Sequence, residues 1–365
     1  MSPSDKYKTI HYQSYLNLDK LLDSQHPRSL QVEGKLAHDE MLFIIVHQVY
    51  ELWFKQIIHE LTSVHQILAS QKIDERDIGI MVHRLSRVNK IMKLAVDQID
   101  VLETMTPLDF LDFRDYLFPA SGFQSFQFRI FEIILGLNDK KRLTYNNEHY
   151  KSVFNEAQKQ EIKSLEDSKS IHFLIQKWLE RMPFFKHKNF EFLSSYKEAV
   201  KQMIEKESAL INQSHHLNNS EKEMRLKMLE GNQDYFDQVL DEQKHNQLLK
   251  DGSITFSFKA TVAALFIRLY RDQPILQGPY QLLTSLKDLD ERLTNWRSRH
   301  AQMVLRMIGK KIGTGGSPGF DYLAKTVEKH QVFSDLLNIS TLLIPRDQLQ
   351  PLPAEIEKEL GFYFH

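Results

Sequence analysis

Apolar residues recur at intervals of three and four along most of the chain, which is the period of amphipathic helices. Residues 40–68 form the most apolar of these segments, and residues 74–104 carry a stripe that runs from Ile78 through Leu85 to Leu94. No segment alternates apolar and polar residues over enough positions to indicate a strand. We therefore expect an all-α fold, with the first two turns of residues 40–68 buried because they are apolar nearly all round.

Several of the predicted helices begin at residues that commonly cap helices. Asp39 precedes the most apolar segment and is expected to be its N-cap. Thr106 is expected to cap a further helix, with Pro107 at the first helical position and Asp109 at the capping-box position. A loop and another buried helix should follow in the segment PASGFQSFQFRIFEIILGL, which begins at Pro119.

The last third of the chain predicts one long helix and a loop. A helix over FSFKATVAALFIRLY should stop before Pro274, because the residue before a proline disfavours the helical conformation. Pro279 should then open a helix that continues to about Lys310. The helix gives way to GTGGSPG, residues 313–319, and the residues beyond predict two short helices and a partly helical tail.

Composition suggests an arm, a main domain and an insert within that domain. Residues 1–37 resemble an arm, residues 38–365 a helical domain, and residues 138–252 within it are strongly charged. We interpret the charged stretch as an insert of solvated helices, because such helices most often serve solubility or oligomer contacts. In the arm, Tyr12 and Tyr15 lie three residues apart and would project the same way from a helical turn.

The charge balance and the missing cysteines exclude several functional classes. With 47 basic and 48 acidic residues the formal net charge is −1, so the chain lacks the positive field that nucleic-acid binding requires. The most apolar run, residues 41–46, is too short to span a membrane, and the first residues lack a signal-peptide core. We therefore expect a cytoplasmic protein. Without cysteine there can be no disulfide, thiolate metal site or covalent haem attachment.

One histidine interrupts an apolar stripe in the long predicted helix. His300 shares a face with Trp296 and Met303, and the glycine-rich loop follows shortly after. An imidazole in an apolar wall beside a donor-rich loop suits a large flat cofactor with polar edges. A lone histidine in such a stripe is nevertheless more often a core residue than a ligand, and the pattern alone leaves both interpretations open. Another face of the helix would suit solvent or anions, because it carries Arg292, Arg299 and Arg306.

A single arginine lies in an aromatic segment further upstream. Arg114 follows Phe110 and Phe113 in the helix predicted after Thr106, so its guanidinium should be only partly solvated. Arginine in such surroundings usually pairs with a carboxylate. The sequence leaves open whether this carboxylate belongs to Asp112, to Asp115 or to a ligand.

Four long segments, taken together, resemble tryptophan 2,3-dioxygenase, the haem enzyme that opens the indole ring of L-tryptophan. They are HDEMLFIIVHQVYELWFKQ, TPLDFLDFRDYLFPASGFQSFQFR, NWRSRHAQMVLRMIGKKIGTGGS and LNISTLLIPR. The resemblance extends from about Tyr12 to Pro351 and is weakest across the charged insert. Because several motifs agree in one order, it is far more specific than a single short motif.

The resemblance implies a haem-binding helical bundle with a noncovalent b-type haem. The implied reaction joins L-tryptophan and O₂ to give N-formyl-L-kynurenine, the first step of the kynurenine pathway. His300 resembles the proximal ligand of the haem iron, and we expect it to be the only protein ligand. His47 resembles the distal-side histidine that accepts a hydrogen bond from the indole N–H. The indole-binding segment before it comprises Phe43, Ile44, Ile45 and Val46.

The resemblance also assigns residues to the polar end of the substrate. Arg114 resembles the guanidinium that binds the substrate carboxylate, with Phe110 beside it. Thr314 resembles a contact to the ammonium or carboxylate group of the amino acid. Ser121 is a candidate for the rim of the same site.

An oligomer is implied as well. Tyr12 and Tyr15 resemble arm residues that complete the pocket of a neighbouring subunit in a homotetramer. The expected partners are thus L-tryptophan, O₂ and further copies of the chain, with neither nucleic acid nor a membrane. Two residues depart from the family pattern and could alter loop closure: Pro318 stands where serine is common, and Phe320 where tyrosine is usual.

The chemistry of an indole amino acid agrees with these assignments. An indole needs an apolar slot, an acceptor for its N–H and polar groups for its zwitterionic end. His47 can accept that hydrogen bond only while neutral, a state that burial favours. Two alternatives remain: a haem-binding sensor or storage protein without turnover, and a helical scaffold without a cofactor. A Soret band would exclude the scaffold, and formation of formylkynurenine would exclude the sensor.

Overall fold

The computed structural model describes residues 9–137, 142–143, 150–183, 186–187, 190–314 and 319–361. Almost all regular structure in these ranges is helical, which confirms the expected all-α fold, and the two strands are a two-residue antiparallel pair. In chain order the elements are α1 (Tyr12–Leu16), α2 (Leu18–Leu22), α3 (Arg28–Glu33), α4 (His38–Leu68), α5 (Glu75–Leu102), α6 (Pro107–Arg114), α7 (Phe126–Leu135), α8 (Glu156–Asp167), α9 (Ile171–Leu179), β1 (Lys186–His187), β2 (Phe190–Glu191), α10 (Phe192–Gln213), α11 (Asn219–Leu240), α12 (Glu242–Lys250), α13 (Phe258–Leu269), α14 (Pro274–Ile308), α15 (Phe320–Lys329), α16 (Ser334–Asn338) and α17 (Ala354–Leu360).

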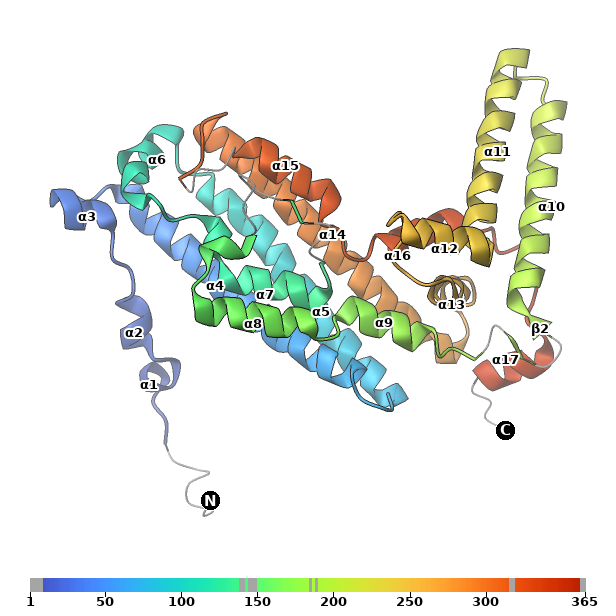
Figure 1. The fold of residues 1–365 in the computed structure, drawn as a ribbon, viewed down its shortest axis with the longest axis horizontal. Helices are drawn as coiled ribbons and strands as arrows, with labels where there is room; N and C mark the ends of the chain where they lie inside the picture. Colours follow the sequence, from blue (N-terminus) through green and yellow to red (C-terminus); the bar gives the residue numbers. More distant parts are fainter. Residues whose placement is uncertain are drawn as a thin grey trace.

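Three long helices, α4, α5 and α14, form the framework (Figure 1). Helix α5 packs along both α4 and α14, and its apolar stripe is buried between them, with Met81, Leu85 and Met92 fully enclosed. Burying one such side chain stabilises the fold by about 1.5–3 kcal/mol relative to leaving it in water. Leu94, expected in the same stripe, is instead 51% exposed, because it lies on the outer side of the helix.

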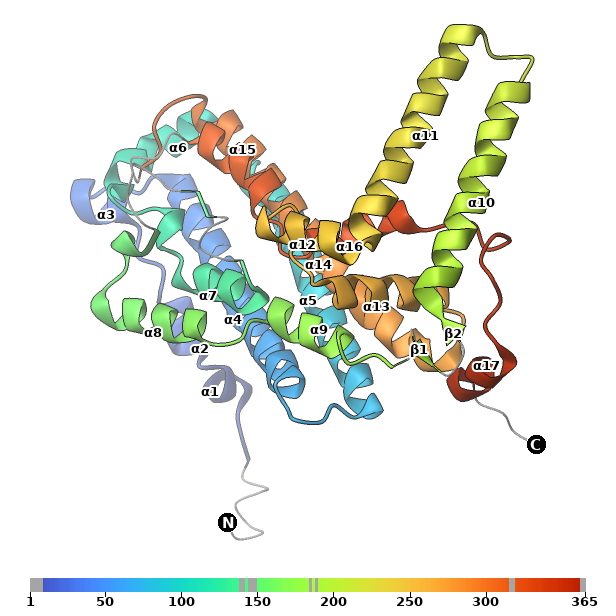
Figure 2. The same ribbon diagram turned by 45° about the vertical axis from the view of Figure 1, so that its right-hand side comes forward.

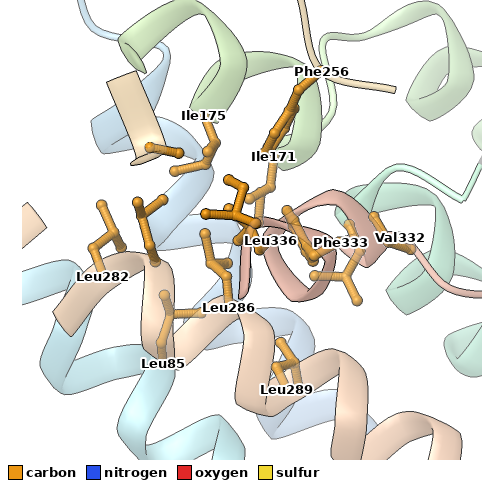
Figure 3. Packing of buried hydrophobic residues seen from close by; sticks show 14 of the residues in the cluster. Leu85, Ile171, Ile175, Phe256, Leu282, Leu286, Leu289, Val332, Phe333 and Leu336 are labelled. Atoms are coloured by element: carbon orange, nitrogen blue, oxygen red, sulfur yellow. The ribbon is translucent and has the colours of Figure 1, made fainter. Parts of the chain in front are cut away.

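Helix α9 joins this core although it lies within the charged stretch of sequence. Ile171 and Ile175 of α9 are fully buried and pack near Leu286 of α14 and Leu336 of α16 (Figure 3). By contrast, α10 and α11 form a hairpin that projects from the body in both views (Figures 1 and 2). Only part of the charged stretch is therefore solvated as expected. His215 and His216, at the turn of the hairpin, are exposed.

The helix starts confirm some expected caps and overturn others. Thr106 caps α6 with a capping box to Asp109, and Pro107 is the first helical residue, as predicted. The prediction for Asp39 is wrong: α4 begins at His38, so Asp39 lies within its first turn. The negative Asp39 side chain in the first turn still stabilises α4, because it lies at the positive end of the helix dipole.

The start of the long C-terminal helix also differs from the prediction. Helix α14 begins at Pro274, five residues before Pro279, which lies inside it. The prediction was wrong because Pro274 can occupy the first helical position, where no N–H is required. Pro279 costs only the single hydrogen bond of its own missing N–H, in a helix held by extensive packing against α5.

Helix α4 is less buried at its start than its composition predicts. Phe43 and Ile44 are half-buried and Ile45 is 43% exposed, so the expectation of burial fails for these turns. Helix α4 alone among the described helices is long and apolar enough to cross a membrane, a test that core helices of soluble proteins also pass. Here α4 packs along α5 and α7, and its first turns border a cavity.

The arm is helical and attached to α4 by buried hydrogen bonds. Glu40 of α4, 1% exposed, accepts hydrogen bonds from the backbone N–H groups of Arg28 and Ser29 at the start of α3. The Gln25 side chain bonds that of Gln48 in α4 at 2.7 Å. The arm beyond these contacts, α1 and α2, extends away from the body (Figure 1).

Candidate active site

The main cavity lies among α4, α5, α6, α7, α14 and α15. Its volume is about 310 Å³, within the range of small-molecule sites. Apolar and aromatic side chains dominate the lining, and both predicted histidines, His47 and His300, border it. The structure thus brings together two residues that lie 253 positions apart in the sequence.

His300 is held by the helix that carries it and by an aromatic partner one turn earlier. The ring of Trp296 stacks on that of His300 with centroids 5.3 Å apart and an angle of 11° between the planes. Burial, with a smaller contribution from the nearby His47, lowers the pKa of His300 to about 4. Within the described ranges no protein group hydrogen bonds to this ring.

Trp296 is itself enclosed by aromatic rings from two other helices. Tyr50 and Phe54 of α4 meet it edge-on at 6.0 and 6.2 Å between centroids, and Phe128 of α7 lies at 5.0 Å. Such offset and edge-to-face contacts add about 0.5–1.5 kcal/mol per pair beyond burial. The orientation of the His300 ring is therefore fixed by packing contributed by α4 and α7.

His47 projects from α4 into the same cavity, and its hydrogen bonding defines its tautomer. Its Nδ1 lies 2.7 Å from the carbonyl oxygen of Phe43, which can only accept, so Nδ1 carries the proton. Burial lowers the pKa of His47, against smaller opposing effects of the Phe43 carbonyl and Glu51. The ring is therefore neutral near pH 7, and Nε2 is left as a hydrogen-bond acceptor.

An aromatic group surrounds His47. The ring of Phe43 lies 4.1 Å from that of His47 and 5.8 Å from that of Phe110, between centroids. Phe113 is fully buried, and its ring contacts that of Phe43. Ile44, Ile45 and Val46 do not border the cavity, and Val46 is buried in the core instead.

Arg114 reaches the cavity from the end of α6. Its Nη2 donates to the carbonyl oxygen of Ile312 at 2.5 Å, and its Nε is buried without a hydrogen-bond partner. In the described part of the chain neither Asp112 nor Asp115 forms an ion pair with it. The structure therefore pairs Arg114 with neither of the two aspartates that the sequence left open, and its guanidinium bonds a backbone carbonyl instead.

The residues expected around the substrate's polar end lie close to Arg114. Thr314 borders the cavity, and its hydroxyl donates to the carbonyl of Ala120 at 2.8 Å. Ser121, next in the chain, also borders the cavity and caps a short 3₁₀ turn. Phe320 begins α15, whereas Pro318 lies outside the described residues.

Tyr12 and Tyr15 do not reach the cavity of their own chain. Both lie on α1 and are 71% and 70% exposed.

Two of the three α14 arginines expected to suit solvent or anions lie beside acidic side chains at the end of α5, although Arg306 is also exposed to solvent as expected. Arg299 bonds Asp100 at 2.5 Å and Glu103 at 3.2 Å, and Arg306 lies 3.7 Å from Glu103, so two of them join α14 to α5.

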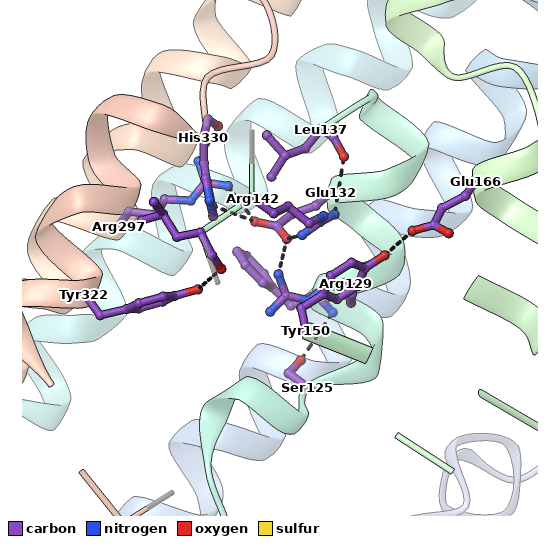
Figure 4. A network of polar contacts seen from close by, with 12 residues as sticks. Ser125, Arg129, Glu132, Leu137, Arg142, Tyr150, Glu166, Arg297, Tyr322 and His330 are labelled. Carbon is purple, nitrogen blue, oxygen red and sulfur yellow. Dashed lines mark hydrogen bonds and ion pairs between the residues drawn. The ribbon is translucent and has the colours of Figure 1, made fainter. Parts of the chain in front are cut away.

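A buried polar network at the cavity wall was missed by sequence reasoning. Glu132 of α7, 1% exposed, bonds Arg129, Arg142 and Arg297, and His330 lies beside it (Figure 4). Burial alone raises the pKa of a carboxyl group, but the three guanidiniums hold the pKa of Glu132 well below its usual range. The available signal was a pair of opposite charges three positions apart, Arg129 and Glu132, within the otherwise apolar run FRIFEIIL.

The site is thus an aromatic-lined cavity in a helical protein, bordered by two histidines and by the arginine at the end of α6. The sequence comparisons give the family. The family profile described as Tryptophan 2,3-dioxygenase matches residues 3–343. Three relatives carry the same name, tryptophan 2,3-dioxygenase. That of Bdellovibrio bacteriovorus is 48% identical over 98% of this chain and 100% of its own length.

The other two relatives are similar to the chain to nearly the same degree. The protein of Dictyostelium discoideum is 46% identical over 97% of this chain and 89% of its own length. That of Xenopus tropicalis is 43% identical over 96% and 86%. The chain therefore belongs to the tryptophan 2,3-dioxygenase family, which confirms the resemblance and the expected enzyme class.

Proposed function

We propose that the protein binds a noncovalent b-type haem at His300 and converts L-tryptophan and O₂ to N-formyl-L-kynurenine. Both oxygen atoms enter the product as the C2–C3 bond of the indole breaks, so the reaction needs no net reductant. One observation carries the proposal: a neutral imidazole acceptor, His47, is fixed in the cavity that His300 also faces.

The residues present fit a haem. His300 has a strongly lowered pKa, so its ring is neutral and able to ligate iron, and no described protein group competes for it. Met303 and Met307 add apolar surface on the same helix. When bound, ferrous haem would supply the oxygen chemistry. Because the chain has no cysteine, attachment must be noncovalent.

The distal residues orient the substrate. His47 Nε2 would accept the indole N–H, and the rings of Phe43 and Phe110 would hold the indole plane. Because Nδ1 is already bonded to the Phe43 carbonyl, His47 can take this role without changing its tautomer. It orients the ring and need not remove a proton.

The polar end of tryptophan would bind at the rim. Arg114 offers a planar fork to the carboxylate, and its unbonded Nε is available for that purpose. Thr314 and Ser121 stand beside it to bind the ammonium or carboxylate group. This arrangement recognises an amino acid in preference to indole alone.

The proposal extends to assembly and location. Tyr12 and Tyr15 are exposed apolar residues on an ordered helix, which suits contact with a neighbouring subunit. We infer a cytoplasmic homotetramer in which each arm completes an adjacent site.

The deciding experiment reconstitutes purified protein with haem, then adds reductant, L-tryptophan and O₂. We expect a Soret band and growth of the formylkynurenine absorbance. A Soret band without product would favour the sensor or storage alternative, and absence of haem binding would leave only the scaffold.

A further inference from the structure

A carboxylate, Glu51, borders the cavity one helical turn beyond His47. Both residues lie on α4, four positions apart, so their side chains project from the same face of the helix. The Glu51 side chain is half-buried, and both residues line the cavity. The proposed function gives a role to His47 and none to Glu51.

The carboxylate of Glu51 is held in place by neutral donors from the start of α7. The Ser125 hydroxyl donates to Oε1 at 2.6 Å, and the Gln127 side-chain amide donates to Oε2 at 3.0 Å. The same amide also donates to the backbone carbonyl of Glu51 at 2.8 Å. Ser125 is itself fixed, because it is the N-cap of α7 and accepts a hydrogen bond from the N–H of Phe128. The carboxylate therefore keeps one position on the face that also carries His47.

These contacts leave the negative charge of Glu51 uncompensated. In the described part of the chain Glu51 forms no ion pair, and Lys55, one turn further along α4, is exposed. Glu132, the other carboxylate that borders the cavity, is by contrast bonded by three guanidinium groups. A charge that is partly removed from water and not neutralised acts over a longer range, because the surrounding dielectric constant is lower. The charge of Glu51 can therefore act on the His47 ring.

The other titratable or charged groups around the cavity lie mostly on other elements. The charged groups and histidines among them are Arg114 at the end of α6, Arg129 and Glu132 of α7, Arg297 and His300 of α14, and His330 after α15. Both of these histidines are neutral near pH 7, because burial lowers the pKa of each to about 4. The two tyrosines of the lining, Tyr50 and Tyr322, are neutral as well, because burial raises the pKa of each.

We propose that Glu51 is a positioning residue for the proposed reaction, whose fixed negative charge makes Nε2 of His47 a stronger acceptor for the indole N–H. As oxygen adds to the indole ring, positive charge develops at the ring nitrogen and its N–H becomes a stronger donor. A charge that is already in place where such a change occurs stabilises the transition state without rearranging. The inference rests on the proposed function, since it takes His47 to contact the indole.

The acid–base behaviour of His47 agrees with this role. Burial lowers the pKa of His47, and the charge of Glu51 is among the smaller effects that raise it. The ring therefore stays neutral near pH 7, while Glu51 restores part of the basicity that burial removes. Glu51 acts on His47 and need not contact the substrate.

The test compares Glu51→Gln with the matched control Ser125→Ala. The first variant removes the charge, whereas the second removes a hydrogen bond to the same carboxylate and keeps the charge. The acid limb of kcat/KM for tryptophan should follow protonation of His47 in the free enzyme. We expect Glu51→Gln to move this limb to lower pH by about 0.5–1 unit and to lower kcat/KM at pH 8 by about 2- to 3-fold. Ser125→Ala should leave the position of the limb unchanged.

Titration of the His47 ring gives a second reading that does not depend on turnover. The full chain, labelled with carbon-13 at histidine Cε1, is titrated by NMR, and His47→Gln identifies the His47 signal. Glu51→Gln should move the His47 midpoint in the same direction as the acid limb. If neither the midpoint nor the limb moves, or if Ser125→Ala moves them equally, Glu51 is structural and the inference is wrong.

Gln127→Lys provides the test if Glu51→Gln does not fold. The substituted ammonium group would pair with the Glu51 carboxylate and neutralise it in place, and Gln127 is not among the residues that border the cavity. The acid limb and the His47 midpoint should again move to lower pH, and unmoved values in this variant would overturn the inference. If the unaltered protein forms no formylkynurenine, the proposed function fails, while the NMR titration still decides whether Glu51 acts on His47.

Discussion

The two helices that carry the cavity's histidines are built differently. On α14, the ring of His300 stacks on Trp296, which is enclosed by Tyr50, Phe54 and Phe128. On α4, His47 is held by a bond to its own helix, and its neighbourhood remains open. One wall is packed into the core, and the other borders an arm and loops.

This difference separates what a single chain supplies from what a ligand or neighbour completes. The His300 wall is assembled from aromatic side chains of α14, α4 and α7 that contact one another. The His47 wall depends on Arg114, whose guanidinium is tied to the Ile312 carbonyl, and on Thr314, tied to the Ala120 carbonyl. Changes on the first side should therefore alter cofactor retention, and changes on the second side substrate affinity.

The largest effect should come from His300→Ala. The variant should lose haem or hold it weakly in a form that added imidazole restores, because the substitution removes the proposed iron ligand from the cavity wall. The Soret spectrum and haem content of purified protein measure this. His215→Ala, on the exposed hairpin turn, is the control. Normal haem content in His300→Ala would contradict the assignment.

Arg114→Ala should leave haem content unchanged and weaken tryptophan binding by about 30- to several-thousand-fold, the usual effect of removing one partner of a buried charged pair. Equilibrium titration of the haem spectrum with tryptophan measures the affinity. The variant should also discriminate less against indole compounds without a carboxylate. Arg306→Ala, at the α5–α14 contact, serves as control. Unchanged affinity would make Arg114 structural.

Deleting residues 1–16 should preserve haem content, since no residue of α1 borders the cavity that His300 lines. The deletion should raise the tryptophan requirement sharply if the arm completes a neighbouring site. Terminal residues of this kind stay mobile unless something docks them. Mixing the deletion variant with His300→Ala subunits under exchange conditions should restore some activity. Equal affinity in the shortened chain, or no complementation despite proven exchange, would show that the arm only packs.

His47→Ala should slow turnover or weaken binding yet keep measurable activity, because the imidazole orients the indole and need not remove its proton. 1-Methyltryptophan, which lacks the N–H, should lose less from the mutation than tryptophan does. Steady-state rates with both substrates test this. Complete loss of activity with intact haem and intact binding would indicate obligatory proton removal.

The smallest effect concerns pH. The pKa of His330 is about 4 in the folded protein against 6.5 for the free side chain, because of burial. As the pH falls, His330 is therefore protonated in the unfolded chain before it is protonated in the folded protein. The stability that is fully present above pH 6.5 is lost as the pH falls towards 4. At pH 5 the loss is about 2 kcal/mol. His330→Gln should flatten this part of a urea-unfolding pH profile, and an identical profile would exclude His330.

Local features of the sequence predicted local features of the structure. The capping box at Thr106 depends on four consecutive residues, so it could be recognised directly. The N-cap prediction for Asp39 failed because several acidic residues near a helix start can stabilise it equally well. The neighbouring Glu40 accepts hydrogen bonds from α3 instead of capping α4. The burial prediction for Leu94 failed because the apolar stripe of α5 is wide enough to contact two neighbouring helices. The sequence pattern does not show which edge of such a stripe stays exposed.

Site residues could be predicted where they stand out within a single helix. They could not be predicted where the site forms from segments that are distant in the sequence. His47 and His300 stand out within their own apolar helices and both border the cavity, but their roles came from the family resemblance. The Glu132 cluster joins residues from α7, a loop and α14, which no local pattern relates. Tyr12 and Tyr15 await a partner subunit, so their expected role stays a prediction.

The hydrogen bond between His47 and Phe43 uses the main-chain carbonyl of Phe43, not its side chain. No substitution at position 43 can remove that acceptor. Mutation at Phe43 can therefore change the shape of the proposed indole slot without changing the tautomer of His47. In this enzyme, substrate range and the protonation pattern of the distal imidazole are separately evolvable traits.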